Sequence, residues 1–112
     1  MSDLATRKCK PCERGASPMN AEQVRQYLIM IDGTWKVENE GKQISRTFKF
    51  DNYYQTTAFV NAVAWIAHSE DHHPDINFGY NKATVIYSTH AVGGLSENDF
   101  ICAAKVDALL GS

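Results

Sequence analysis

The apolar residues that follow residue 20 recur at helical spacing. Four of them stand at i, i+3, i+4 and i+7 and predict one face of a helix: Val24, Tyr27, Leu28 and Ile31. Asn20 precedes this run with Gln23 three residues later, the pattern of an N-cap and its reciprocal partner. Asp32-Gly33 follows the run, and glycine readily takes the left-handed conformation that ends many helices. A first helix is therefore expected between Asn20 and Asp32.

Strand-like alternation comes next and predicts a β-hairpin. Trp35 and Val37 mark its first strand, and Asn39-Glu40-Gly41 supplies the turn. The returning strand places three apolar residues on one face: Ile44, Phe48 and Phe50. Arg46 lies on that same face between them, so we expect this strand to be buried unevenly.

The second half of the chain has the same order of helix and hairpin. Asn52 and Gln55 give the capping pattern again, and a helix is expected from Tyr53 to His68. Pro74 cannot continue this helix. Two strands are then predicted over residues 75–80 and 83–90, from the alternation in the first and the β-branched and aromatic residues in the second. A last helix follows, capped by Ser96 with Asp99.

The order α-β-β-α-β-β-α predicts an α+β fold. Two hairpins with amphipathic helices favour a four-stranded antiparallel sheet with three helices packed on one face. A length of 112 residues is typical of one domain with a single core. Residues 1–19 are charged, contain Pro11, Gly15 and Pro18 and lack an apolar period, so we expect a flexible N-terminal tail followed by a domain over residues 20–112.

Composition excludes some classes of partner. The net charge of -2 does not favour binding to nucleic acid or to an anionic membrane. No apolar run reaches the roughly 20 residues of a membrane span, and the N-terminal residues lack the apolar core of a secretory signal. Three cysteines, an odd number, do not suggest a disulfide framework, so a reducing cytoplasm is the expected location.

Cys9-Lys10-Pro11-Cys12 is the one cysteine motif. A C-x-x-C pair can be half of a zinc site or a redox dithiol. Zinc would want a second pair, whereas Cys102 stands alone in the predicted last helix, and a thioredoxin-type site would want a strand before the motif and a long helix after it. The sequence favours an exposed tail that carries two cysteines.

All four histidines lie between His68 and His90. His72 and His73 follow the second helix, and His90 closes the last strand. Since the strand over residues 75–80 leaves this point and the strand over residues 83–90 returns to it, His90 is expected near His72 and His73 at one edge of the sheet. The topology therefore predicts one site from three separated histidines.

Three interpretations of the histidine cluster stay open. A metal site is suggested by His68 and His72 at i, i+4, although the chain lacks the H-E-x-x-H arrangement of zinc proteases. A structural role would place histidines at the end of a helix, where the dipole favours a cation. Acid–base chemistry is favoured, since histidine exchanges protons near neutral pH and Glu70 or Asp71 could orient a ring. Without a nucleophile elbow or a phosphate loop, such a site points to elimination, hydration or isomerisation.

Several motifs, in order and at compatible spacing, resemble the pterin-4a-carbinolamine dehydratases over roughly residues 20–110. They are Gly33-x-Trp35, Phe48-x-Phe50, Asp71-His72-His73-Pro74, Tyr80-Asn81-Lys82, Ser88-Thr89-His90 and Gly94-Leu95-Ser96-Glu97-x-Asp99. The resemblance implies dehydration of 4a-hydroxytetrahydropterin to quinonoid dihydropterin, which recycles the pterin of aromatic amino-acid hydroxylases. It also implies a homodimer or homotetramer and no metal or cofactor.

The same resemblance implies roles for individual residues. His72 and His90 would be the acid–base pair, and His73 would chiefly hold the substrate. Four further residues match positions near the pterin pocket: Asp71, Ser88, Thr89 and Asp99. The alternative for each is a purely structural role in a turn or a helix cap. In the family, an acidic residue often stands at the position of His68. If that carboxylate orients a catalytic histidine in the family, this chain must orient its histidine in another way.

Other functions also stay open after the resemblance. Some animal relatives act as dimerisation partners of a transcription factor, so a partner-binding module is an alternative. A metal-binding protein is another, and it would respond to chelation where a dehydratase would not.

Overall fold

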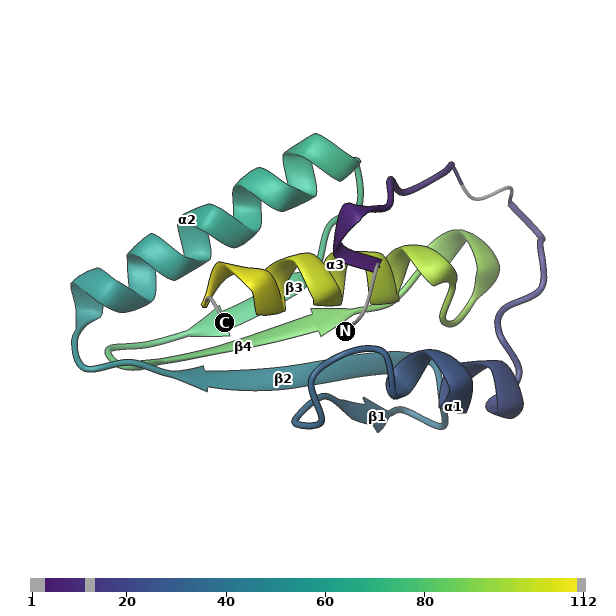
Figure 1. Cartoon of the computed structure of the whole chain (residues 1–112), viewed down its shortest axis with the longest axis horizontal. Helices are drawn as coiled ribbons and strands as arrows, with labels where there is room; N and C mark the ends of the chain where they lie inside the picture. The colour runs from purple at the N-terminus through teal and green to yellow at the C-terminus, as the bar shows by residue number, and fades with distance from the viewer. Residues whose placement is uncertain (1–3, 12–13, 111–112) are drawn as a thin grey trace.

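The α+β fold predicted from the sequence is confirmed by the structure (Figure 1). The computed structural model describes residues 4–11 and 14–110. Its elements follow in chain order: η1 (Leu4–Thr6), α1 (Ala21–Leu28), β1 (Lys36–Glu38), β2 (Gln43–Lys49), α2 (Tyr53–Glu70), β3 (Asp75–Phe78), β4 (Lys82–Tyr87), η2 (His90–Val92) and α3 (Glu97–Leu109).

The four strands form one antiparallel sheet in the order β1-β2-β4-β3. In the central pair, Ile44 lies opposite Tyr87 and Phe48 lies opposite Ala83, and all four side chains are buried. The residues that alternate with these, Ser45 opposite Ile86 and Thr47 opposite Thr84, point to the other face, where all but Ile86 carry a hydroxyl group. Alternation therefore gives the sheet one apolar face and one polar face, as the sequence predicts.

The three α-helices cover the apolar face, with α3 between α1 and α2 (Figure 1). α1 contributes Val24 to the core, α2 contributes Phe59 and Val63, and α3 contributes Phe100 with most of its other residues. A helix in the middle position is surrounded on nearly all sides, which explains why α3 has little amphipathic pattern. None of the helices in the described residues is both long and apolar enough to cross a membrane.

α1 ends earlier than the sequence predicts. Its Asn20–Gln23 capping box is present, but the helix stops at Leu28 instead of reaching Asp32-Gly33. The amides of Met30 and Ile31 bond to carbonyls three residues back, which tightens the chain out of the α-helix. Ile31 is nevertheless buried. The apolar spacing therefore predicted correctly that this side chain is buried, but predicted too long a helix.

Arg46, the charged residue on the apolar face of β2, is explained by a partner on α3. Its guanidinium lies 2.7 Å from Asp107 Oδ1, which also accepts a 2.8 Å hydrogen bond from Trp35 Nε1. The other oxygen of Asp107 accepts the amide of Asp32, and the guanidinium stacks over the Phe48 ring at 4.3 Å. Asp107 therefore joins the hairpin to α3 through three donors.

We expect Asp107→Ala to lower the free energy of unfolding by about 2–4 kcal/mol, because it leaves a largely buried guanidinium and an indole N–H without their acceptor. Urea denaturation measures this change. Glu22→Ala is the matched control, since Glu22 and Arg25 form an exposed ion pair worth less than about 0.5 kcal/mol. Equal stability of the two variants would contradict the assignment of Asp107 as a link between hairpin and helix.

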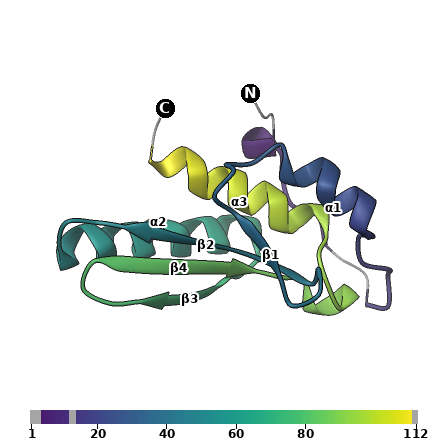
Figure 2. The same ribbon diagram turned by 90° about the horizontal axis from the view of Figure 1, so that it is seen from below.

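The described part of the N-terminal segment lies against α3 (Figure 2). Leu4 is fully buried in the core, and Lys105 Nζ donates a 2.7 Å hydrogen bond to the carbonyl of Ala5. These contacts could not be predicted from the sequence, because a short segment with one buried leucine has no periodicity. The boundary at residue 19, with a flexible tail before it, stays a prediction.

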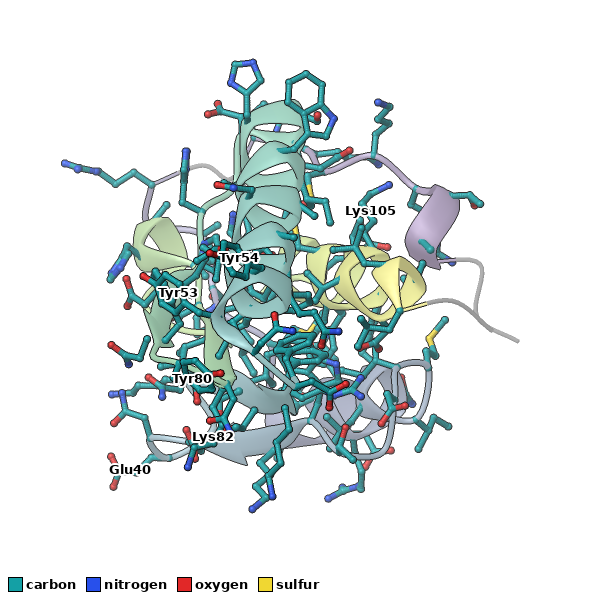
Figure 3. All side chains as sticks on the ribbon, turned by 90° about the vertical axis from the view of Figure 1, so that its left-hand side faces the viewer. Glu40, Tyr53, Tyr54, Tyr80, Lys82 and Lys105 are labelled. Carbon is teal, nitrogen blue, oxygen red and sulfur yellow. The ribbon has the colours of Figure 1, made fainter. Side chains whose placement is uncertain are left out.

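Several aromatic side chains remain exposed outside the core. Tyr53, Tyr54 and Tyr80 lie at the end of the molecule where α2 begins (Figure 3), with exposed fractions of 47%, 84% and 64%. Trp65, further along α2, is 67% exposed. Large exposed aromatic groups of this kind are common at surfaces that associate with another protein.

Candidate active site

The His-His-Pro segment is placed by the end of α2. Asp71 takes the left-handed conformation (φ 53°, ψ 44°) and turns the chain out of the helix, with its amide bonded to the carbonyl of Ala67. His72 and His73 follow this turn directly, and β3 begins one residue after Pro74. Because proline cannot continue a helix and favours extended geometry before it, the two histidines are held at the edge of the sheet.

The third histidine arrives from β4. This strand ends at Tyr87, earlier than the sequence predicts, and Thr89 then forms an isolated bridge to Gly94. His90 begins the short helix η2, which Gly93 closes in the left-handed conformation. β3 and β4 pair in antiparallel register, so His90 returns to the sheet edge from which His73 departs.

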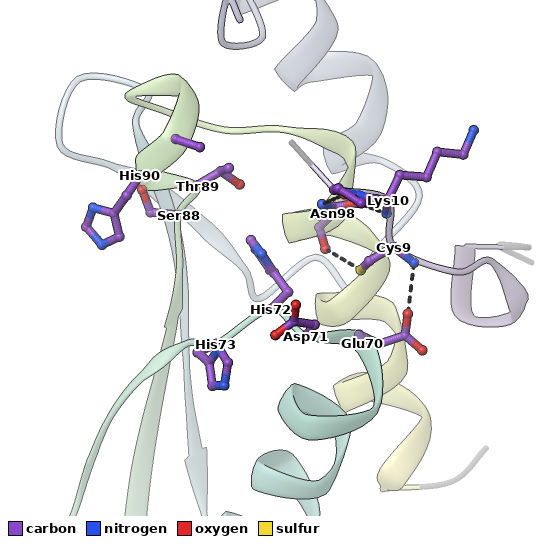
Figure 4. Close-up of a pocket in the computed structure, with 12 residues that line it drawn as sticks. Cys9, Lys10, Glu70, Asp71, His72, His73, Ser88, Thr89, His90 and Asn98 are labelled. Atoms are coloured by element: carbon purple, nitrogen blue, oxygen red, sulfur yellow. Dashed lines mark hydrogen bonds between the residues drawn. The ribbon is translucent and has the colours of Figure 1, made fainter. Parts of the chain in front are cut away.

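A cavity of about 590 Å³ lies between these segments (Figure 4). Figure 4 shows the rings of His72, His73 and His90 on different sides of it. Its lining includes six of the seven predicted site residues: Asp71, His72, His73, Ser88, Thr89 and His90. The size is in the range of pockets that hold a small organic ligand.

Asp99, the seventh predicted residue, is fully buried behind His72 and does not line the cavity. Its Oδ1 lies 2.6 Å from His72 Nε2. Its Oδ2 accepts hydrogen bonds from the Thr89 hydroxyl at 2.8 Å and from the amide of Ser96 at 3.0 Å. The residue is thus both the helix cap that its spacing predicts and the carboxylate that orients a histidine.

The Asp99 contact determines how His72 presents its ring. A carboxylate accepts hydrogen bonds, so Nε2 carries the proton, and in the neutral ring Nδ1 keeps the lone pair. The ring also lies nearly parallel to that of Tyr87, with centroids 6.0 Å apart. Burial, with Cys102, Cys9 and Asp99 nearby, raises the pKa of the Tyr87 phenol, so this neighbour stays neutral. The Asp99 carboxylate and the Tyr87 ring therefore hold the His72 ring in one orientation.

The two hydroxyl residues after β4 are already engaged by protein partners. Ser88 donates a 2.9 Å hydrogen bond to the carbonyl of Lys42, and the Thr89 hydroxyl contacts Asp99 and Ser96. Thr89 is 5% exposed, and its amide and carbonyl are bonded to the backbone of Gly94. A ligand would meet this segment chiefly through the exposed side of Ser88.

His68 lies away from the cavity. It is exposed on α2, and its ring contacts that of Trp65 at a centroid distance of 5.4 Å. The i, i+4 spacing to His72 therefore does not create a shared site. Within residues 4–11 and 14–110, no group of three histidine, cysteine or acidic side chains is arranged to hold a metal ion.

Sequence reasoning missed the N-terminal strap, residues 7–11, which forms one side of the cavity. Cys9, Lys10 and Pro11 line it together with Asn98. The side chain of Asn98 accepts a hydrogen bond from the amide of Lys10 at 3.0 Å and donates one to its carbonyl at 2.6 Å. No local pattern could reveal this contact, because the partners are 88 positions apart.

Glu70 holds the strap from the other side. Its Oε1 accepts a 2.8 Å hydrogen bond from the amide of Cys9, and Oε2 lies 3.7 Å from Lys105 Nζ and 3.9 Å from Lys8 Nζ. Burial alone would raise the pKa of this carboxyl, but the Cys9 amide and the two ammonium groups outweigh burial and lower the pKa below 4.5. Glu70 was a candidate partner of a histidine, whereas in the structure it ends α2 and binds the strap.

We expect the strap to loosen in acid through Glu70. Since the folded pKa is lowered, the stabilisation is complete above the unfolded value near 4.5 and is lost as pH falls below it. Glu70→Gln should lower stability at neutral pH and flatten its dependence on pH below 4.5, as measured by urea midpoints. Glu40→Gln, at an exposed turn, is the control, and identical acid profiles for wild type and Glu70→Gln would contradict the role.

Comparison with known proteins agrees with the motifs. Residues 17–109 match the family described as Pterin 4 alpha carbinolamine dehydratase. A "Putative pterin-4-alpha-carbinolamine dehydratase" of Nitrosomonas eutropha is 61% identical over 108 residues, covering 96% of this chain and 94% of that protein. A protein of the same name from Legionella pneumophila is 49% identical over 109 residues, with 97% and 96% covered.

Solved structures show the same fold. A "transcriptional coactivator/pterin dehydratase" of Brucella melitensis superposes with a TM-score of 0.79 at 28% identity, over 85% of this chain and all of that one. A "pterin dehydratase-like protein" described as a RuBisCO assembly factor in the alpha-carboxysome gives a TM-score of 0.61 at 31% identity, over 70% of this chain and 92% of that one. With the family match over residues 17–109 and near full-length identities of 49–61%, the chain belongs to the pterin-4a-carbinolamine dehydratase family.

Proposed function

We propose that this protein is a hydro-lyase that dehydrates 4a-hydroxytetrahydropterin to quinonoid dihydropterin and water. The product would return to the pterin pool of an aromatic amino-acid hydroxylase, in the cytoplasm. The single observation that carries the proposal is the arrangement of three histidines around one cavity, with His72 oriented by the buried carboxylate of Asp99. Family membership supplies the substrate class.

The reaction requires two proton transfers on adjacent atoms of the pterin. The C4a–O bond breaks, and the departing hydroxyl takes a proton to leave as water. N5 gives its electron pair to a new C4a=N5 double bond and loses its own proton. His72, through Nδ1, and His90 are the pair that exchanges these protons, one as donor and one as acceptor, because histidine does both near neutral pH.

The other lining residues position the pterin. His73 holds the substrate between the acid–base pair, and Asp71 and Ser88 offer polar groups at the rim. Thr89 keeps its hydroxyl on Asp99 and its backbone on Gly94, so it shapes this side of the cavity. Asp99 acts on the substrate through His72 and not by contact, which makes it a positioning residue.

A hydroxylase assay tests the function. An aromatic amino-acid hydroxylase turning over with tetrahydropterin releases 4a-hydroxytetrahydropterin, whose spontaneous dehydration is slow enough to follow by absorbance. Catalytic amounts of this protein should abolish the accumulation of the carbinolamine and speed the appearance of quinonoid dihydropterin. Unchanged accumulation in the presence of folded protein would contradict the proposal and favour a partner-binding role.

We also propose that the protein assembles as a homodimer or homotetramer. The exposed aromatic residues of α2, Tyr54 and Trp65, support association, since both would gain from burial. Light scattering after size-exclusion chromatography measures the mass, and a monomer at micromolar concentration would contradict this assembly.

A further inference from the structure

The thiols of Cys9 and Cys102 lie in contact, although 93 positions separate them in the chain. Their Sγ atoms are 3.6 Å apart, and the Cys9 thiol also lies 3.7 Å from the carbonyl oxygen of Asn98. Cys102, which stands alone in the sequence, thus contacts the first residue of the C-x-x-C motif, where the strap packs on α3.

The two thiols differ in their access to solvent. Cys102 is fully buried on α3, whereas Cys9 is partly buried and lines the cavity (Figure 4). A small molecule in the cavity can therefore reach Cys9 but not Cys102. The hydrogen bond with Cys9, followed by burial, raises the pKa of the Cys102 thiol, so Cys102 stays protonated while Cys9 reacts first.

The strap holds Cys9 in position for a reaction with Cys102. Its amide is bonded to Glu70, and the next residue, Lys10, is held on both backbone groups by Asn98. A disulfide has a sulfur–sulfur distance of about 2.05 Å, so the two atoms need to approach by roughly 1.5 Å. A short peripheral segment can supply such a shift more easily than the core of α3 can.

We propose that Cys9 and Cys102 are an oxidative modification site, at which a hydroperoxide converts the thiol pair into a disulfide that fastens the N-terminal strap to α3. The Cys9 thiolate attacks the peroxide and the O–O bond breaks, so that Cys9 becomes a sulfenic acid. The leaving hydroxide or alkoxide takes the proton that the Cys9 thiol released and departs as water or an alcohol. Cys102 sulfur then attacks Cys9 sulfur and expels hydroxide, which takes the Cys102 proton as water. Each sulfur loses one electron and the peroxide gains two.

This modification is independent of the dehydratase reaction, so its test needs no pterin. Its consequence is mechanical: the wall of the cavity formed by the strap becomes covalently fixed, and thiol reductants release it. Two other outcomes use the same cysteines, namely a Cys9–Cys12 disulfide within the motif and a zinc ion bound by thiolates.

The experiment oxidises the full-length protein with hydrogen peroxide after reduction and treatment with EDTA. Free thiols are counted, and peptide mass spectrometry under non-reducing conditions identifies the linked cysteines. Cys12→Ser is the matched variant, because it removes the rival pairing and keeps both contacting thiols. Cys9→Ser, at a partly exposed position, removes the contact without opening a cavity in the core. Trypsin then probes the strap at Lys8, since the Lys10–Pro11 bond resists trypsin.

The expected result is an intramolecular link between peptides that contain Cys9 and Cys102, in wild type and in Cys12→Ser, reversed by dithiothreitol and absent in Cys9→Ser. Tryptic cleavage after Lys8 should slow by about tenfold or more on oxidation, because cleavage requires the strap to open locally. A Cys9–Cys12 link, a dimer joined by disulfides, no loss of thiols in Cys12→Ser, or stoichiometric zinc in the protein before EDTA would each overturn the proposal.

Discussion

Replacing His90 with alanine is expected to lower the rate of catalysed carbinolamine dehydration by about 10²–10⁴-fold, the range typical for loss of a positioned acid or base. His90 borders the cavity from η2 and is exposed, so its removal takes away one proton carrier and leaves the core intact. The fall should appear mainly in kcat, since the flat pterin keeps its other contacts. Stopped-flow absorbance of freshly generated substrate measures it.

Two controls separate chemistry from folding in this variant. His68→Ala removes an exposed histidine outside the cavity and should keep the wild-type rate. Added imidazole should restore part of the activity of His90→Ala, because the space it leaves opens to solvent. A His90→Ala enzyme with an unchanged rate would remove His90 from the acid–base pair.

Replacing Asp99 with asparagine is expected to lower kcat by about 10²–10⁴-fold, although the side chain keeps its size. The amide oxygen of asparagine would take the place of Oδ2, which accepts from Thr89 and Ser96. The amide NH₂ would then face His72 Nε2 and donate to it, so the neutral ring would carry its proton on Nδ1 instead. The lone pair that we assign to the cavity would be lost.

The measurement for Asp99→Asn needs a readout beyond activity. Nitrogen NMR of the labelled protein distinguishes the two tautomers of His72, and a reversed tautomer with a preserved fold would support the argument. Thr84→Val, which removes a hydroxyl contact on the polar face of the sheet, is a control for loss of a hydrogen bond far from the cavity. Wild-type kcat in Asp99→Asn would show that His72 does not depend on this carboxylate.

Much of the fold could be predicted because its elements obey simple periods. Alternation in β2 and β4 marked the apolar face, and the capping residues Asn20, Asn52 and Ser96 marked the start of each helix. The predicted end of α1 was wrong. Ile31 is buried at helical spacing from the earlier apolar residues, although the backbone leaves the helix after Leu28. The spacing of apolar residues indicates which side chains are buried, but it does not show where the helical backbone ends.

The site was predictable as a meeting of three histidines and not as a network. Antiparallel pairing of β3 and β4 requires His73 and His90 to lie at one sheet edge, which follows from chain order alone. The Asp99–His72 contact depends on the packing of α3 against the end of α2. In the sequence, the spacing of Asp99 from Ser96 was already explained by the helix cap. When one role of a residue explains its place in a sequence pattern, the pattern gives no sign of a second role.

The strap illustrates a second limit of sequence reasoning. Cys9 and Cys102 contact each other only because η1 and the strap pack along α3, and no periodic pattern precedes residue 20. The family match begins at residue 17, so resemblance to the family also carried no information about this wall of the cavity. Such contacts require coordinates.

The most direct test of the central claim is the dehydration rate of 4a-hydroxytetrahydropterin with EDTA present, for wild type, His72→Ala and His68→Ala in parallel. The account predicts that wild type accelerates the reaction and keeps this acceleration in EDTA. It predicts that His72→Ala, shown by circular dichroism to be folded, loses most of it, whereas His68→Ala retains it. Acceleration that disappears with EDTA, or survives undiminished in His72→Ala, would contradict acid–base catalysis by the histidine cluster.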